Sequence, residues 1–162
     1  MKKTNKSILF LMITFIAVQF AYSSMPVTPQ VVEILQSAEQ MKETISSDLK
    51  GYVMRNGEKV LAENAQPGEI ITWEITLRNN ISQPVNNIRI DGNIPDQTIF
   101  VKNSAANVEY SLDRQTFSRN PTVRDDKGNL VAAPSSRIKA IRFTVSLQGS
   151  ETKTLTYKTT VK

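Results

Sequence analysis

Residues 71–78 read ITWEITLR, and this stretch decides the fold class. Apolar side chains at Ile71, Trp73, Ile75 and Leu77 alternate with polar ones, so an extended backbone would have one apolar and one hydrophilic face. Such alternation predicts a β-strand that packs one face against a core. Trp73 is the only tryptophan of the chain, and we expect it to anchor that core rather than to stack on sugars.

Two segments near the C-terminus repeat the alternation. Residues 141–147 and 155–161 each place their apolar side chains on one face, and we predict that they form a final hairpin. A connection formed by residues 149–151 would pair Phe143 with Tyr157 and keep both apolar faces on the core. A two-residue connection would bring threonines to the core face instead, because a slip of one residue inverts every side chain. A five-residue connection or a bulge would also preserve the core face.

Short strand-like segments separated by turns fill the rest of the C-terminal part. The dipeptide at residues 56–57 is Asn-Gly, which predicts a two-residue hairpin turn because both central positions of a type I′ turn need positive φ. Further strands are expected around residues 85–90, 98–101 and 108–112. About seven short amphipathic strands predict an all-β fold, an antiparallel β-sandwich over residues 51–162.

Residues 113–137 are rich in Arg, Asn, Asp, Pro and Gly. We therefore predict a long irregular segment, and it is the best candidate for a binding loop because binding residues are disproportionately placed on loops. Residues 125–129 offer oxygen atoms to calcium, but they lack the spaced acidic ligands and the closing glutamate of a calcium loop. We interpret them as a turn.

Asp91 and Asp96 flank another predicted turn and are the only acidic pair that we considered for acid/base chemistry. Glycosidase chemistry needs two carboxyl groups at a defined separation in a cleft. Aspartates that bond to their own loop backbone are far commoner, and we interpret this pair in that way.

Residues 1–23 have the composition of an export signal. Three lysines within the first six residues precede an apolar run over residues 8–18, and Ala21 and Ser23 are small residues at the −3 and −1 positions of a cleavage site before Ser24. The run is shorter than the roughly 20 residues that span a bilayer, which disfavours the alternative of a retained membrane anchor. We expect a periplasmic, cell-surface or secreted protein with no stable membrane span after cleavage.

Residues 24–50 combine a proline-bearing leader with a second type of pattern. Apolar residues recur at spacings of three and four from Val31 to Leu49, which predicts a short N-terminal amphipathic helix over residues 30–49. Its last turn is weakened by a Ser-Ser-Asp sequence, so an edge strand over residues 44–55 is the alternative.

Composition excludes several classes of function. The 162 residues contain no histidine and no cysteine, which removes disulfides, thiolate zinc sites, cysteine nucleophiles and the usual Ser-His-Asp triad. We predict a chain that is not an enzyme and uses no metal or cofactor. Without residues 1–23, the 17 basic and 15 acidic residues give a net charge of +2, which offers no case for nucleic acid.

Several short stretches resemble one bacterial family, the conserved repeat domain, also classed as domain of unknown function number eleven. The turn at residues 67–69 and the alternation of residues 71–77 resemble its opening, while residues 94–95, 100–101, 110–113 and 141–143 resemble its middle and second half. The resemblance covers about residues 50–162. It implies an immunoglobulin-like β-sandwich on exported or cell-surface bacterial proteins, and it implies no catalytic residues.

Two functions follow as hypotheses. The first is a non-catalytic cell-envelope or secreted module for structural support or protein–protein interaction, in which the edge strands or residues 113–137 contact another envelope or surface protein. The second is a carbohydrate-binding module for acidic surface polysaccharide. Residues 119–162 hold nine basic and three acidic residues, whereas residues 33–74 hold four basic and eight acidic ones. The candidate ligand-contact residues are Arg119, Arg124, Arg137 and Lys139.

Overall fold

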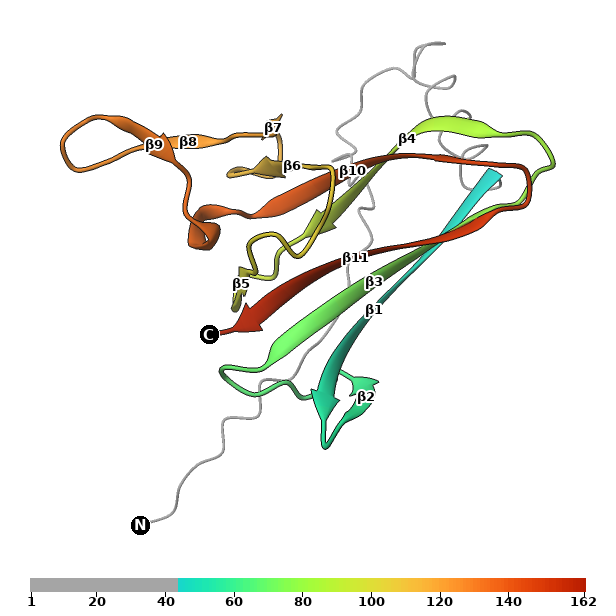
Figure 1. The fold of residues 1–162 in the computed structure, drawn as a ribbon, viewed down its shortest axis with the longest axis horizontal. Helices are drawn as coiled ribbons and strands as arrows, with labels where there is room; N and C mark the ends of the chain where they lie inside the picture. Colours follow the sequence, from blue (N-terminus) through green and yellow to red (C-terminus); the bar gives the residue numbers. More distant parts are fainter. Residues whose placement is uncertain (1–43) are drawn as a thin grey trace, which may run out of the picture.

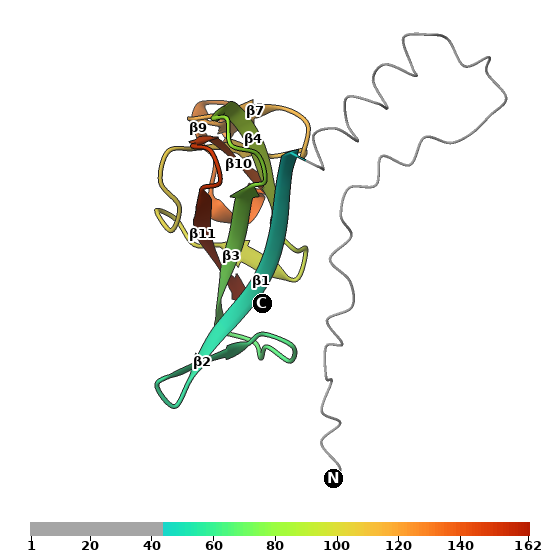
Figure 2. The same ribbon diagram turned by 90° about the vertical axis from the view of Figure 1, so that its right-hand side faces the viewer.

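The protein is described here by a computed structural model that covers residues 44–162. Its strands form two facing antiparallel sheets and a separate two-stranded ribbon (Figures 1 and 2). Sheet A consists, in spatial order, of β2 (Glu58–Leu61), β1 (Ile45–Arg55), β3 (Ile70–Asn79), β11 (Thr152–Val161) and β5 (Thr98–Phe100). Sheet B consists of β4 (Val85–Asn93), β10 (Ala140–Leu147), β6 (Val108–Ser111) and β7 (Phe117–Ser118). The ribbon consists of β8 (Thr122–Arg124) and β9 (Leu130–Ala132), and the short 3₁₀ turn η1 (Ser135–Arg137) follows it.

The core lies between the two sheets and centres on two aromatic rings. The apolar residues of residues 71–78 are all buried, as the alternation predicts. The rings of Trp73 and Tyr157 are stacked, with centroids 6.1 Å apart and planes inclined by 18°. Trp73 Nε1 donates a hydrogen bond of 2.9 Å to Thr159 Oγ1, so the polar atom of the indole is satisfied inside the core. The expectation that Trp73 anchors the core is confirmed.

Two glycines make room for these rings. A Cβ atom at Gly51 of β1 would lie 3.0 Å from Trp73 Cζ3, and one at Gly92 of β4 would lie 2.9 Å from Tyr157 Cε1. The Tyr157 hydroxyl donates to the Asn93 carbonyl at 3.0 Å, while burial raises the pKa of this phenol above its usual range. Each ring of the central pair therefore packs directly against backbone.

The first hairpin is confirmed in detail. Arg55 of β1 pairs with Glu58 of β2, which leaves Asn56 and Gly57 as the two turn residues. Their φ angles are +52° and +82°, as a type I′ turn requires. The hairpin is held against the following turn by Glu69, whose carboxylate accepts two bonds of 3.0 Å from the Arg55 guanidinium.

The predicted helix over residues 30–49 is wrong at residues 45–49. Residues 45–49 belong to β1 and pair with β3, so the alternative of an edge strand holds there. Ile45 and Leu49 lie four residues apart, which suits a helical stripe, but they also share one face of a strand. The strand region thus begins before residue 51. Residues 30–43, the leader at 24–29 and the signal at 1–23 lie outside the described residues.

The predicted final hairpin is also wrong. Phe143 of β10 pairs with Ile90 and Val108 in sheet B, whereas Tyr157 of β11 pairs with Trp73 in sheet A. The connection from β10 to β11 therefore crosses between the sheets. The alternation of apolar and polar residues predicts which face of a strand is buried. It does not predict which strand lies beside it, because two strands in opposite sheets can bury their apolar faces as well as two neighbouring strands can.

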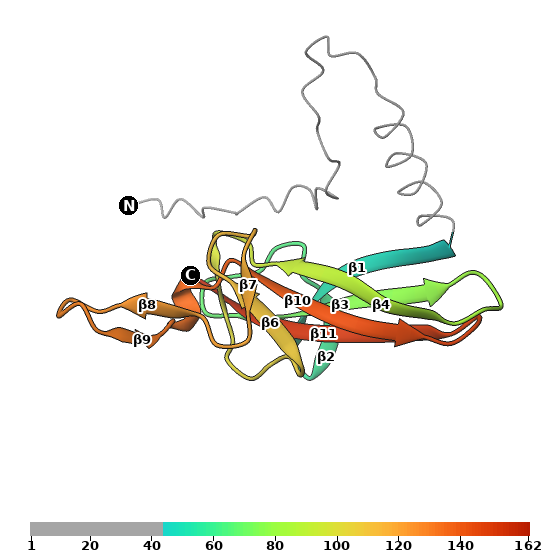
Figure 3. The same ribbon diagram turned by 90° about the horizontal axis from the view of Figure 1, so that it is seen from above.

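Two such crossing connections lie side by side at one end of the sandwich (Figures 1 and 3). Residues 80–84 join β3 to β4, and residues 148–151 join β10 to β11. The buried amide of Asn79 donates bonds of 2.8 Å to the carbonyls of Gln83 and Gln148, so a single side chain links the two connections. Ser150 N also donates to the Ile81 carbonyl at 2.9 Å.

The strand order gives the sandwich its topology. The all-β, antiparallel character is as expected, but residues 44–162 form eleven strands rather than about seven. Three of these strands lie in residues 113–137, so the prediction of a long irregular segment there is wrong in part. In the constant-type immunoglobulin order the last two strands share one sheet. Here the last strand, β11, lies between β3 and β5 in sheet A, while β10 lies in sheet B.

Candidate functional site

The ribbon and its flanks project from one end of the sandwich (Figures 1 and 3). We call residues 119–139, which include this ribbon, the arm. Val123 pairs with Val131, and the connecting turn is ordered by Asp125, whose Oδ1 accepts bonds from the backbone N–H groups of Lys127 (2.9 Å) and Asn129 (2.8 Å). These bonds, chiefly that of Asn129, hold the pKa of Asp125 below its usual range. Residues 125–129 are a turn, as interpreted from the sequence.

The four basic residues proposed as ligand contacts all lie on the arm and are all exposed. Arg124 is near the tip, where its Nη1 donates to the Gly128 carbonyl at 2.7 Å. Arg137 ends η1 and Lys139 immediately precedes β10, both at the base of the arm, and Arg119 precedes β8. The fold thus brings these arm bases (Arg119, Arg124, Arg137 and Lys139) onto one projection, spread from tip to base.

A shallow groove of about 360 Å³ lies where the arm leaves sheet B. Its lining residues include Tyr110, Asp113, Thr116 and Pro121. Asp113 Oδ1 accepts from the backbone N–H groups of Thr116 and Gln115 and from the Ser111 hydroxyl, which holds the pKa of Asp113 well below its usual range. The carboxylate is therefore occupied in ordering its own loop.

The two aspartates of the candidate acid/base pair bind different arginines. Asp91 lies on β4, where its carboxylate accepts bonds of 2.7 and 2.8 Å from Arg142 of β10. The same guanidinium lies 3.7 Å from the centroid of the Phe117 ring. Asp96 is bound instead by Arg114 Nη2 at 2.7 Å. Each carboxylate has its own arginine, so the interpretation that both aspartates bond only to their loop backbone is wrong.

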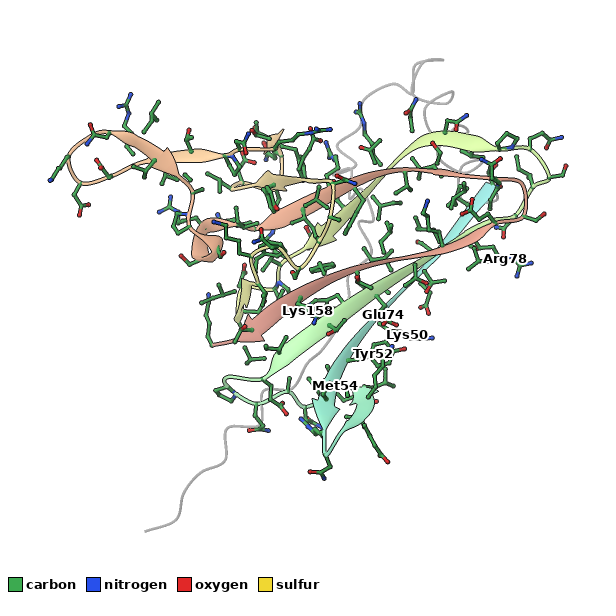
Figure 4. The ribbon with its side chains drawn as sticks, in the orientation of Figure 1. Lys50, Tyr52, Met54, Glu74, Arg78 and Lys158 are labelled. Carbon is green, nitrogen blue, oxygen red and sulfur yellow. The ribbon has the colours of Figure 1, made fainter. Side chains whose placement is uncertain are left out.

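A second surface emerges on the outer face of sheet A, near the first hairpin (Figure 4). We call Tyr52, Met54, Leu61 and Ile70 the hairpin patch. Met54, Leu61 and Ile70 are 65%, 51% and 50% exposed. Tyr52 pairs with Leu61 of β2 on one side and with Thr72 of β3 on the other, and Ile70 lies two residues before Thr72 on the same face. Three strands therefore contribute apolar side chains to one exposed area.

The surroundings of the hairpin patch are polar. Lys59 Nζ lies 4.1 Å from the centroid of the Tyr52 ring and 2.7 Å from Glu74 Oε1, so a charged pair borders the ring. The rest of the outer face carries Thr, Lys and Arg side chains, among which Lys50, Arg78 and Lys158 are visible in Figure 4. The outer face of sheet A is thus apolar at the hairpin end and hydrophilic elsewhere.

Five of the six exposed large hydrophobic residues within residues 44–162 gather in two places. Three are in the hairpin patch, and Leu130 and Val131 are on the arm, while Ile81 lies in the connection from β3 to β4. The sequence composition points to the arm but not to the patch. Pairs of adjacent apolar residues such as Val53-Met54 and Ile70-Ile71 could have indicated the patch. Neighbours in a strand point to opposite faces of the sheet, so only one residue of each pair can face the core.

Within the part of the chain that the structure describes, no cluster of three or more acidic side chains could hold a metal ion. Over the same residues no helix is long and apolar enough to cross a membrane. No protein-family model, no curated protein and no solved structure matches the chain.

Proposed function

We propose that this chain is a non-catalytic, exported β-sandwich module that binds another envelope or surface protein through the hairpin patch. The observation that carries this proposal is the exposure of Met54, Leu61 and Ile70 beside Tyr52 on one face of a regular sheet. The centres of protein interfaces are enriched in aromatic residues and methionine and are bordered by polar rims. The patch and its Lys59–Glu74 border have that composition.

Export and the absence of catalysis have support from the sequence. Residues 1–23 carry the signal pattern, and the chain has no histidine and no cysteine. Asp91, Asp96 and Asp113 are each committed to hydrogen bonds, which leaves none of them placed as a general acid or base. Mass spectrometry of the protein from its own envelope fraction should find a chain that begins at Ser24. An intact N-terminus would contradict export by cleavage.

The resemblance to the bacterial conserved repeat domain is part of the same proposal. The turn before β3 is closed by a bond of 3.0 Å from Glu69 N to the Gln66 carbonyl, and Gly68 has a φ of +87°. A positive φ favours glycine, and the turn at residues 67–69, which resembles the opening of the family, has its glycine at this position. An immunoglobulin-like domain with this strand order would differ from the constant type in having its last strand, β11, in the sheet opposite β10.

Site-specific photo-cross-linking tests the proposed surface. A photo-reactive side chain at position 54 should give a discrete adduct with one protein of the envelope fraction. The matched control is the same side chain at Thr154, which is exposed on the polar part of the same sheet face. Ile70→Asp should abolish the adduct, since a charge in the patch centre would be desolvated on binding. Equal adducts from positions 54 and 154 would remove the support for a specific patch.

Binding of acidic polysaccharide is the second candidate, and it is favoured by the exposure of all four arm bases on one projection. Retention on immobilised polygalacturonate should fall steeply as salt rises, because exposed charges are screened beyond about 8 Å at physiological ionic strength. Replacing the four arm bases by glutamine should remove the retention. Replacing Arg78 and Lys158, which are exposed on the outer face of sheet A, should leave it unchanged.

A further inference from the structure

Residues 45–51 of β1 form the longest uninterrupted sheet edge of the sandwich within residues 44–162. Exposed edges are normally shortened, bulged or covered, because their backbone groups recruit further strands. Of the four outermost strands, β2, β5 and β7 have only four, three and two residues. β4 is interrupted by a register shift against β10, and Asn87 at this place has a φ of +57°. β1 has no such interruption, and β2 covers it only from Tyr52 onward.

The free edge of β1 has a defined set of backbone groups. The Gly51 carbonyl accepts from Ala62 N at 2.9 Å on the β2 side, and the Thr44 carbonyl accepts from Asn80 N at 2.8 Å on the β3 side. Because backbone groups alternate between the two sides of a strand, those of Ser47 and Leu49 point toward the free side. No strand of residues 44–162 pairs with β1 there.

The arm has a complementary free edge. Asp125 N donates to the Asn129 carbonyl and Ala133 N donates to the Pro121 carbonyl, each at 2.9 Å, so the odd-numbered residues of β9 and its flanks face β8. The backbone groups of Leu130 and Ala132 therefore point away from the ribbon. Leu130 is 65% exposed, although leucine is usually buried.

An antiparallel pairing of β9 with β1 would place the exposed Leu130 side chain on the core-facing side of β1. In an antiparallel ladder, directly opposite residues have side chains on the same face. If Leu130 pairs with Leu49 and Ala132 with Ser47, the Leu130 side chain lies on the face of Leu49, which is opposite Ile75 and packs on the core. The arm would thus bury its most exposed apolar side chain where β1 already faces inward.

We infer that the arm of one copy adds as an antiparallel strand to the free edge of β1 in a second copy. The two elements lie at opposite ends of the molecule, so they can meet only between copies (Figures 1 and 3). The wider regions carry net charges of opposite sign, while Asp48 and Lys50 pair with each other on β1 itself. The arm has five basic and two acidic residues, whereas residues 44–74, which contain β1 and β2, have three basic and five acidic ones.

The contact is head-to-tail, so each copy uses one arm and one edge. Contacts of this type generate rings or open chains rather than closed two-fold dimers. They do not involve the hairpin patch, so this inference goes beyond the proposed function and stands or fails separately from it.

Sedimentation of the mature chain, residues 24–162, tests the inference. The wild-type protein should form oligomers beyond a dimer as its concentration rises, and salt should weaken them. Leu130→Asp should remove the arm contact, and Ser47→Pro should remove a free-edge donor that the fold of the single chain does not use. Each variant alone should be monomeric, whereas Met54→Asp, in the hairpin patch, should assemble like the wild type.

Mixing the variants tests the head-to-tail geometry. A Ser47→Pro chain keeps a functional arm and a Leu130→Asp chain keeps a functional edge, so an equimolar mixture should form one-to-one dimers and nothing larger. A mixture that remains monomeric, or a wild-type protein that stays monomeric at high concentration, would overturn the inference.

Disulfide trapping covers the case in which Ser47→Pro fails to fold. The chain has no cysteine, so Ser47→Cys combined with Ala132→Cys, which are directly opposite in this pairing, should give oxidised ladders on a denaturing gel. Thr154→Cys combined with Ala132→Cys is the control. Equal ladders from both combinations would show random collision and would count against the inference. Loss of the position-54 adduct with normal ladders would sink only the proposed function.

Discussion

Gly149 packs against the carbonyl group of Ser82 so closely that a Cβ atom at position 149 would collide with it. The two residues belong to the two crossing connections, which join the sheets at the same end of the sandwich. This contact, with the Asn79 amide beside it, fixes how far apart the two connections lie.

Gly149→Ala should therefore be strongly destabilising. The obstacle is backbone, which cannot rotate away, so we expect a loss of more than about 3 kcal/mol in the free energy of unfolding. Urea denaturation followed by Trp73 fluorescence measures it. Gly128→Ala is the control, because a Cβ there meets nothing within 4 Å and only the φ of +83° is unfavourable. Equal losses for both variants would contradict the packing explanation.

The hydrogen bond from Trp73 Nε1 to Thr159 Oγ1 gives a second prediction. Thr159→Val keeps the shape of the side chain but leaves the indole N–H buried without this acceptor, which should cost about 1–3 kcal/mol of stability. Thr159→Ser keeps the hydroxyl and loses only a methyl group. If urea unfolding shows the valine variant to be as stable as the wild type, the bond contributes nothing to the fold.

Tyr157 should make the fold sensitive to alkali. Burial raises the pKa of this phenol in the folded chain above the value of about 10 expected when the chain unfolds. Its contribution to stability is fully present below about pH 10 and is lost as the pH rises toward the folded pKa, because the unfolded chain releases the proton first. The urea midpoint should therefore fall above about pH 10. Tyr157→Phe should flatten that fall, and an unchanged slope would exclude Tyr157 as its source.

Asp113 should act in the opposite direction, at low pH. Backbone donors hold its folded pKa well below the value of about 3.9 that it takes in the unfolded chain. The stability that it contributes is present above that value and is lost as the pH falls through the folded pKa. Asp113→Asn can keep the oxygen acceptor but cannot titrate. The variant should lose less stability than the wild type between neutral and acid pH, as measured by thermal unfolding.

The parts of the fold that the sequence predicts are those set by local rules. The Asn56-Gly57 turn follows from its need for positive φ, and the buried face of β3 follows from alternation. The positions of β10 and β11 do not follow, because the side chains of Phe143 and Tyr157 define an inner face without defining the neighbouring strand. Only non-local packing, such as that of Gly149 on Ser82, decides which strands become neighbours.

The candidate surfaces show the same division. The arm bases could be found from composition because charge is read directly from the chain. The hairpin patch was missed because Met54 and Ile70 are ordinary strand residues whose exposure depends on which neighbour, Val53 or Ile71, fills the core. The free edge of β1 was missed in part because its first residues also fit a helical stripe.

The central place of β11 has a consequence for biogenesis. This strand consists of residues 152–161, and it joins β3 to β5. A chain still emerging from the ribosome lacks that link, so its N-terminal sheet stays split until the last ten-residue strand becomes available. The export proposed for this chain would benefit from such a delay, because sheet A cannot close before residues 152–161 are made.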